Sequence, residues 1–443
     1  MKALGIPFGL IFTSFFYFPF YFTFFPEANT KMIVALMGLV WLLVRMGNSG
    51  HRMISKDFFI VSLYALGVSF SSYLSMTVND SIDGAYLSYL VTMWVWTGAA
   101  YFVANFIKTV HGKVSVELVC FYMIAVGALQ CLLAISIAMF VPLKDFVDSF
   151  LAGEGFMGKA VEGRLYGIGC ALDVAGGRFA VLLVMIAFLL PNMFSKMNSY
   201  VYVIPLLAAF GIIAIIGNMI GRTTTVGLIL ALFYWTYILF AKQGIKGQER
   251  TQMIRWLIGG AFVVIFVSIY LYHVSDFWHE YFHFGFEGFF SLVERGRWVV
   301  QSNELLKEGL IFPDNFRTWI IGDGYMGSME SDPYYQGEFW YGFYKGTDAG
   351  YSRFLFYFGL IGLGAFILFL FKVCRVCMKC SVRYQYMFLT IFLLNMAIWV
   401  KVSTDIFLAF APFLCLAVQG VKDDTVEFAD DVQRKGVKYG CYR

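Results

Sequence analysis

The sequence predicts an all-α protein that crosses a membrane many times. Hydrophobic residues make up 60% of the chain and aromatic residues 19%, whereas only 14% of the residues are charged, and the mean hydropathy is +0.71. The apolar residues gather in runs long enough to cross the ~30 Å hydrocarbon core of a bilayer as helices. Together these observations indicate a polytopic helical membrane protein.

About twelve apolar runs are candidate spans. They lie near residues 4–25, 32–45, 58–78, 86–107, 117–141, 174–191, 200–219, 223–241, 255–275, 350–372, 384–400 and 402–420. The first run follows Lys2 as a secretory signal would, but no small-residue cleavage site occurs before Pro26, so we expect a retained span. We therefore treat residues 1–420 as one transmembrane domain and residues 421–443 as a cytoplasmic tail.

Basic residues in the connections predict the orientation, because Lys and Arg near span ends are retained on the cytoplasmic side. With the N-terminus inside, 20 of the 33 basic residues fall on the inner side and 13 on the outer side. The short outer connections hold few of them, such as Lys31 and Lys401. Both termini are therefore expected to be cytoplasmic, and the net charge of +4 requires no nucleic-acid partner.

Two outer connections, residues 142–173 and 276–349, are longer than connectors need to be, and long loops usually carry function. In the second, the apolar residues from Phe289 to Leu310 follow helical spacing, which predicts one helix lying in the membrane interface. The segment from Trp319 to Tyr351 is rich in tyrosine, tryptophan and glycine. Its rings suit stacking on sugars, or they form the aromatic belt common at membrane interfaces.

Six of the arginines on the predicted outer face are candidate ligands for an anion. They are Arg164, Arg178, Arg222, Arg295, Arg297 and Arg353. Their concentration on one face predicts an anionic substrate, because the forked guanidinium group is the usual clamp for phosphate oxygens. For each arginine the alternative is a side chain that reaches to lipid phosphate, and Arg295 and Arg297 in particular suit holding an interfacial helix on headgroups.

Three short segments carry most of the candidate chemistry. In residues 163–178, glycines would bring the backbone close to a ligand flanked by two of the arginines. In residues 217–225, Arg222 stands at the head of a helix, where free N–H groups, the helix dipole and the hydroxyl of Thr223 favour an anion. In residues 348–353, Asp348, Tyr351 and Arg353 lead into the tenth span.

These segments resemble the O-antigen polymerase and ligase superfamily, and within it the Wzy-type O-antigen or capsular polysaccharide polymerases. The similarity lies in GRLYGIGCALDVAGGRFA at 163–180, GRTTT at 221–225 and GLIGL at 359–363. In ligases a histidine typically precedes the last motif by about eleven residues, and that position here is Asp348. The difference favours the polymerase branch.

The resemblance implies a GT-C-like glycosyltransferase in the bacterial inner membrane with its active site facing the periplasm. Its donor and acceptor would be oligosaccharide repeat units on undecaprenyl diphosphate, and a polysaccharide chain-length regulator would be a candidate protein partner. No cofactor is implied, and His273, His279 and His283 lack the acidic pattern of a catalytic metal site.

Chemical reasoning assigns roles to the candidate residues. Guanidinium groups would stabilise the negative charge that develops on the diphosphate leaving group, with Arg222 first and Arg178 and Arg164 beside it. A partly desolvated carboxylate would take the proton of the acceptor hydroxyl, with Asp348 as first candidate and Asp173 as second. Both carboxylates have a structural alternative, namely ion pairs with Arg353 and Arg178.

Three other functions stay open at this stage. A ligase would transfer finished polymer to the lipid A core, and an oligosaccharyltransferase would use a peptide acceptor. A transporter for the same lipid-linked sugar would place charged groups near the middle of the membrane, whereas the spans here are mostly uncharged at their centres.

Overall fold

The computed structural model describes residues 2–49, 55–151, 163–194, 196, 199–241, 247–327 and 343–418. The predicted tail at 421–443 lies outside these ranges, as does the part of the aromatic segment at 328–342. The helices and strands are α1 (Lys2–Tyr17), β1 (Tyr21–Phe22), β2 (Phe25–Asn29), α2 (Thr30–Ser49), α3 (Lys56–Asn79), α4 (Tyr89–His111), α5 (Val116–Met139), α6 (Val141–Phe150), α8 (Leu172–Met193), α9 (Tyr200–Ile220), α10 (Thr224–Phe240), α11 (Gly247–Val274), α12 (Asp276–Gly285), α13 (Glu287–Arg295), α14 (Gln301–Gly309), α15 (Phe316–Ile321), the 3-10 turn η3 (Tyr344–Gly346), α16 (Gly350–Cys380), α17 (Gln385–Ile398) and α18 (Phe407–Val418).

The fold is nearly all helical, as the sequence predicts, and it has the long apolar helices of a multi-pass membrane protein. Within the described ranges, eight helices are long and apolar enough to cross a membrane, judged by length and composition. These eight coincide with predicted spans: α2, α3, α4, α5, α8, α9, α11 and α16. The other four predicted spans coincide with the shorter apolar helices α1, α10, α17 and α18.

The first predicted span is shorter in the structure than the apolar run that suggested it. Helix α1 ends at Tyr17, and residues 21–29 form the small antiparallel hairpin of β1 and β2. Pro19 has no amide hydrogen with which to continue the helix. The amide of Thr30 donates to the carbonyl of Phe20 (2.9 Å), which closes the hairpin at the start of α2.

The single interfacial helix predicted from Phe289 to Leu310 is wrong. The structure has two helices there, α13 and α14, and α13 ends at Gly296 in the left-handed backbone conformation (φ 65°). Glycine adopts this conformation without strain and commonly terminates helices. The arginines of this stretch consequently lie at and beyond a helix end.

Helix α8 is the central element of the bundle, because 83% of its apolar window is buried and it packs against α5, α9, α10 and α17. Its packing against α10 is a backbone contact: a Cβ added at Gly227 of α10 would lie 2.3 Å from the Cα of Ala180 in α8. Small residues that allow such close approach are the usual basis of helix packing in membranes.

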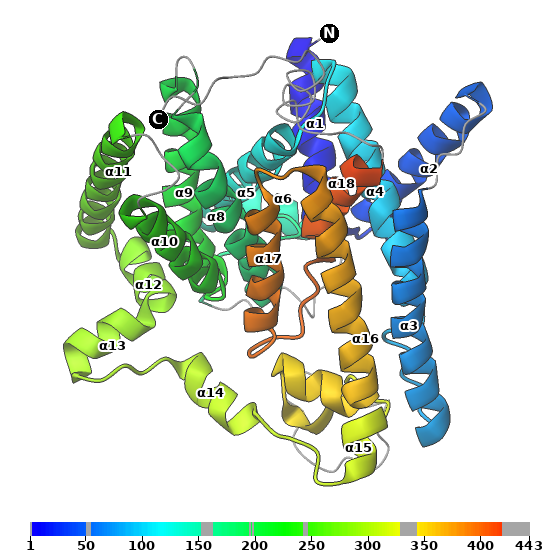
Figure 1. The fold of residues 1–443 in the computed structure, drawn as a ribbon. Helices are drawn as coiled ribbons and strands as arrows, with labels where there is room; N and C mark the ends of the chain where they lie inside the picture. Colours follow the sequence, from blue (N-terminus) through cyan, green and yellow to red (C-terminus); the bar gives the residue numbers. More distant parts are fainter. Residues whose placement is uncertain are drawn as a thin grey trace, which may run out of the picture.

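Helices α12 to α15 form an arc at the end of the bundle where α8 begins and α17 ends (Figure 1). The start of α1 lies at the opposite end of the bundle (Figure 1). Helix α16 is kinked at Phe358 and Gly359, where the glycine has a φ of 62° and lies against the backbone of Ile320 in α15. The kink sets the first turns of α16, which carry Arg353, apart from the rest of the helix.

We expect Gly227→Ala to destabilise the protein by ~1–3 kcal/mol, because the added methyl group has to push α10 away from α8. The unfolding temperature of the purified protein in detergent measures the effect. Gly364→Ala in α16 is the matched control, since a Cβ there meets no atom within 4 Å, and it should be neutral or slightly stabilising. Equal unfolding temperatures for the two variants would contradict the close α8–α10 contact.

Candidate functional site

The three segments singled out in the sequence meet at one end of the bundle. The amide of Leu165 donates to the carbonyl of Met219 (3.2 Å), and a Cβ added at Gly221 would lie 2.4 Å from the carbonyl oxygen of Leu172. The third segment joins through the connection between α17 and α18, because the amide of Tyr351 donates to the carbonyl of Trp399 (2.9 Å). Residues about 50 and 180 positions apart in sequence thus become neighbours.

Arg222 lies in the tight turn between α9 and α10, and only 13% of its side chain is exposed. It forms an ion pair with Glu287, the first residue of α13, and its guanidinium carbon lies 4.5 Å from the ring centroid of Phe284. The guanidinium carbon of Arg164 lies 5.1 Å from the same ring. Two cationic side chains from distant segments therefore converge on one aromatic ring, and one of them, Arg222, also pairs with a carboxylate.

Sequence reasoning missed Phe284 and Glu287. Both belong to the long connection 276–349, in which the histidines and the tyrosine-rich segment are the more conspicuous features. The remaining signal is weak: Glu287 starts a helix, where acidic residues are common for reasons of the helix dipole alone. Only the fold shows that its carboxylate reaches Arg222.

The hydroxyls of the threonines that follow Arg222 all bind acceptors within the protein, whereas the sequence suggested that they would favour a bound anion. Thr223 donates to the carboxylate of Asp173, and Thr225 donates to the side-chain oxygen of Asn218 (2.6 Å). Thr224 donates to backbone carbonyls of the same turn. These bonds fix the turn and the Asp173 carboxylate, so Thr223 has a positioning role.

Asp173 is ion-paired with Lys401 (3.0 Å), not with Arg178 as the structural alternative proposed. About a fifth of each side chain is exposed, at 20% for Asp173 and 22% for Lys401. With the hydrogen bond from Thr223 as well, this carboxylate is held as an ionised acceptor. Lys401 was noted only as a basic residue in a short connection, and its pairing could not be read from sequence.

Asp348 has a different environment. Within the residues that the structure describes, its carboxylate forms no ion pair and no hydrogen bond with another side chain. Burial and, next, the charge of Asp173 raise its pKa above the ordinary value, while Lys401 and Arg353 act in the opposite direction. It is thus a partly desolvated carboxyl beside other charges, which suits proton transfer.

Arg353 is not bound to Asp348 directly, although the two charges interact. Its guanidinium group donates to the hydroxyl of Ser403 (2.7 Å) and to the carbonyl of Met326 (3.2 Å), and it lies 4.2 Å from the ring centroid of Phe343. Its Nε is buried without a hydrogen-bond acceptor among the described residues. Arg353 therefore keeps one donor for a ligand.

The remaining predicted residues lie apart from this group. The guanidinium group of Arg178 lies over the ring of Phe18 (5.7 Å), on a different face of α8 from Asp173. Arg295 and Arg297 are exposed at the end of α13, and in the described part of the chain no contact joins them to the other candidates. The hydroxyl of Tyr351 donates to the carbonyl of Met396 (2.9 Å) and ties α16 to α17.

Of the glycines in residues 163–169, Gly167 and Gly169 pack closely against the protein, whereas a Cβ at Gly163 would meet no atom within 4 Å. Gly169 has a φ of 66°, and a Cβ there would lie 2.4 Å from the carbonyl oxygen of Phe18 and 2.8 Å from that of Pro19. The loop is thus fitted against the end of α1. This close fit fixes the start of α8 and so the position of Asp173.

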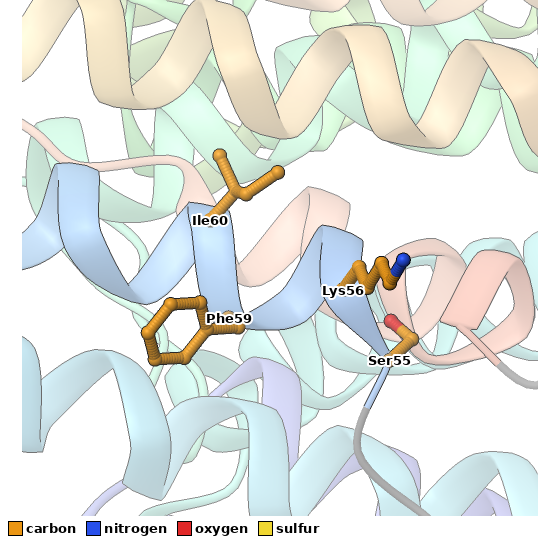
Figure 2. A pocket seen from close by; sticks show the side chains of 4 residues that line it. All are labelled: Ser55, Lys56, Phe59 and Ile60. Carbon is orange, nitrogen blue, oxygen red and sulfur yellow. The ribbon is translucent and has the colours of Figure 1, made fainter.

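Two further features lie outside the group. In the described ranges no three His, Cys, Asp or Glu side chains are grouped as metal ligands. A cavity of about 440 Å³ is lined by Ser55, Lys56, Phe59 and Ile60 at the first turns of α3 (Figure 2). The other end of α3 is ~35 Å away along the helix axis, and there Asn79 donates to the carbonyl of Gly322 (3.0 Å), near α15. The cavity is therefore distant from the candidate site.

The site as a whole is a row of charges contributed by five parts of the chain. We define the charge row as Glu287, Arg222, Arg164, Asp173, Lys401, Asp348 and Arg353. Cations and carboxylates alternate along most of it, with ion pairs at Arg222 and Asp173. Such an arrangement can bind an anionic group in exchange for an internal carboxylate and can move a proton at Asp348.

Replacing Lys401 with methionine should destabilise the protein by up to about 3 kcal/mol, because the Asp173 carboxylate would lose its counter-ion in a partly buried place. The double variant Asp173→Asn with Lys401→Met should recover much of the loss, as a coupled pair does. Unfolding temperatures of the wild-type protein, the two single variants and the double variant measure the coupling. Strictly additive effects would show that the pair is not energetically coupled.

Comparisons of the chain with protein-family models, with curated proteins and with solved structures found no match.

Proposed function

We propose that this protein polymerises oligosaccharide repeat units carried on undecaprenyl diphosphate, as a Wzy-type polymerase of O-antigen or capsular polysaccharide does. The observation that carries the proposal is the charge row. In it, Arg222 and Arg164 share the ring of Phe284, and Asp348, a carboxyl group without an ion pair among the described residues, lies near Asp173 and Lys401. A lipid-linked donor needs cations for its diphosphate, and the acceptor hydroxyl needs a base. Both lie at one end of a helical membrane bundle.

In this proposal the charge row faces the periplasm and both termini lie in the cytoplasm of a bacterial cell. Support comes from the residues at the opposite end of the spans, where Lys196 is paired with Glu117 (2.5 Å) and Lys379 with Asp57 (3.3 Å). That end also carries Arg383, 3.6 Å from Glu117. Basic residues near span ends favour the cytoplasmic side, which leaves the charge row outside.

The diphosphate of the donor would bind at Arg222 and Arg164 and displace the Glu287 carboxylate, since both anions use the same guanidinium group. When the bond between the anomeric carbon and the diphosphate oxygen breaks, its electron pair stays on that oxygen. Two guanidinium groups held in place before the reaction stabilise this charge more in the transition state than in the bound donor. We give Arg222 the leading role because its side chain is mostly buried and contacts both a carboxylate and an aromatic ring.

The acceptor hydroxyl oxygen attacks the anomeric carbon as the diphosphate leaves, and its proton passes to Asp348. Asp173 is unsuited to this step, because Lys401 and Thr223 already bind its carboxylate. Its role is to position Lys401 near Asp348. We propose direct displacement without a glycosyl-enzyme intermediate; detection of a covalent adduct on a carboxylate would overturn that mechanism.

The first test is genetic. The gene is deleted in its host and restored as the wild type, as Arg222→Ala or as the exposed control Arg295→Ala, at matched protein levels. A polymerase predicts single repeat units on the lipid carrier after deletion, a polysaccharide ladder with the wild type and the control, and loss of the ladder with Arg222→Ala. A gel of surface polysaccharide reads the result.

Two outcomes would contradict the proposal. Full-length polymer stranded on the lipid carrier after deletion would mean ligation instead of polymerisation. An unchanged ladder after deletion would discard both activities. A ladder that survives Arg222→Ala would retain the polymerase and remove this arginine from its site.

A second prediction concerns the base. Asp348→Asn should lower the polymerisation rate ~10²–10⁴-fold, the usual contribution of a general base, while Asp173→Asn should act mainly through stability. Because the pKa of Asp348 is raised, the acid limb of the wild-type pH–rate profile should lie above the ordinary aspartate value of about 3.9. The base is lost as pH falls through that limb. Steady-state rates on lipid-linked repeat units across pH measure it, and an unchanged limb in Asp348→Asn would exclude this role.

A further inference from the structure

Lys31, the second residue of α2, is a buried cation without a polar partner. Only 8% of the residue is exposed, and its Nζ lies 4.2 Å from the ring centroid of Trp96 in α4. Within the described ranges it makes no hydrogen bond and no ion pair. Burial of a charged group costs several kcal/mol unless a counter-ion compensates, and an ionisable side chain inside a membrane domain indicates a functional site.

Arg178, a half-buried residue of α8, is a second cation whose charged group lacks a polar partner among the described residues. The hydroxyl of Tyr17 donates to the backbone carbonyl of Arg178 (3.2 Å), but its guanidinium group makes no hydrogen bond or ion pair in the part of the chain that the structure describes. Its contact is the ring of Phe18 (5.7 Å). The side chains of Lys31 and Arg178 interact electrostatically, although like charges repel.

Contacts of the surrounding residues bring together the segments that carry the two cations. The hydroxyl of Thr30 accepts from the amide of Phe20 (3.3 Å) and donates to the carbonyl of Phe15 (3.0 Å), which joins the start of α2 to the end of α1. Phe18, between these two anchors, packs against Phe179 of α8 with ring centroids 5.6 Å apart. Lys31 directly follows Thr30 in sequence, and Arg178 directly precedes Phe179.

One carboxylate among the described residues, that of Asp405, acts on Lys31. Asp405 accepts a hydrogen bond from the hydroxyl of Tyr89 (2.5 Å) and one from the amide of Phe407 (2.7 Å), and its charge acts on Lys31. It forms no ion pair within 4 Å among the described residues. Among the described residues, this group thus has two basic side chains and one carboxylate, which leaves an excess of one basic side chain.

This group is separate from the charge row. Asp173 and Arg178 both belong to α8, but five residues correspond to ~7.5 Å along the axis and to a different helix face. Asp173 faces α10 and Lys401, whereas Arg178 faces the end of α1. Aromatic rings adjoin the second group: Trp96, which stacks with Phe407 at 5.8 Å, and Phe18.

We infer that Lys31 and Arg178 form a second anion site, which binds the carboxylate of an acidic sugar in the repeat unit. A carboxylate carries one negative charge and balances the excess, whereas a diphosphate carries at least two. The guanidinium fork fits a carboxylate in two-point contact, and the adjoining rings suit the C–H face of a sugar. The inference rests on the proposed function and adds the class of sugar that the protein accepts.

The test measures binding to the purified full-length protein in detergent by saturation-transfer NMR, with glucuronate, glucose and inorganic pyrophosphate as probes. Glucuronate should bind the wild type saturably and glucose should not. Lys31→Met and Arg178→Gln should each weaken glucuronate binding at least tenfold, whereas Lys31→Arg, which keeps the charge, should retain it. Lys307→Met, at an exposed lysine, is the matched control and should bind as the wild type does.

The contrary outcomes are distinct. Absence of glucuronate binding, or glucuronate binding unaffected by Lys31→Met and Arg178→Gln in correctly folded protein, would overturn the inference. Pyrophosphate binding that depends on Lys31 would assign this site to the diphosphate instead. The binding measurement does not require polymerisation. If the polysaccharide ladder depends on Arg222 but glucuronate does not bind, only the second anion site is overturned. Glucuronate binding together with a polysaccharide ladder that is unchanged by deletion of the gene would overturn the proposed polymerase activity.

Discussion

The contact that the rest of the structure depends on is the approach of α8 to the turn between α9 and α10. At Gly176 and Gly221 the two backbones come closer than any side chain would allow, and one turn further along Gly227 meets Ala180 in the same way. Three glycines therefore decide where Arg222 and Asp173 lie. A membrane bundle has no hydrophobic force between its helices, so such surface complementarity, with polar bonds such as that from Thr223, sets its geometry.

The charges in this bundle follow one rule with few exceptions. Where a charged side chain lies inside the protein, a partner of opposite sign usually comes from a distant segment, as Lys401 does for Asp173. Among the described residues there are three exceptions: Asp348 and Arg178 have no counter-ion in contact, and Lys31 has only the more distant carboxylate of Asp405. An unpaired charge is stable only when the environment or a ligand compensates for it, and this reasoning connects the base of the proposed reaction with the second anion site.

Hydropathy was sufficient to predict where the long apolar helices lie, because apolar length is a property of single segments. It did not predict the break at Gly296, where a glycine ended a helix whose apolar spacing continued. The ion pairs could not be predicted from the sequence, for a different reason. Glu287 and Lys401 lie 65 and 228 residues from their partners, and residue type alone gave no way to choose these two from the other acids and lysines. The arginines themselves were visible because they are rare in apolar surroundings.

The carboxylate that holds Arg222 has a second attachment, since Glu287 also accepts the backbone amide of Gln301 at the start of α14 (3.2 Å). One side chain thus ties both α13 and α14 to the bundle. Any anion that displaces Glu287 from Arg222 therefore loosens α13 and α14 together. By thermodynamic reciprocity, loosening these helices raises the affinity of Arg222 for the anion. Binding of an anion at Arg222 and the ordering of α13 and α14 are then coupled in one equilibrium.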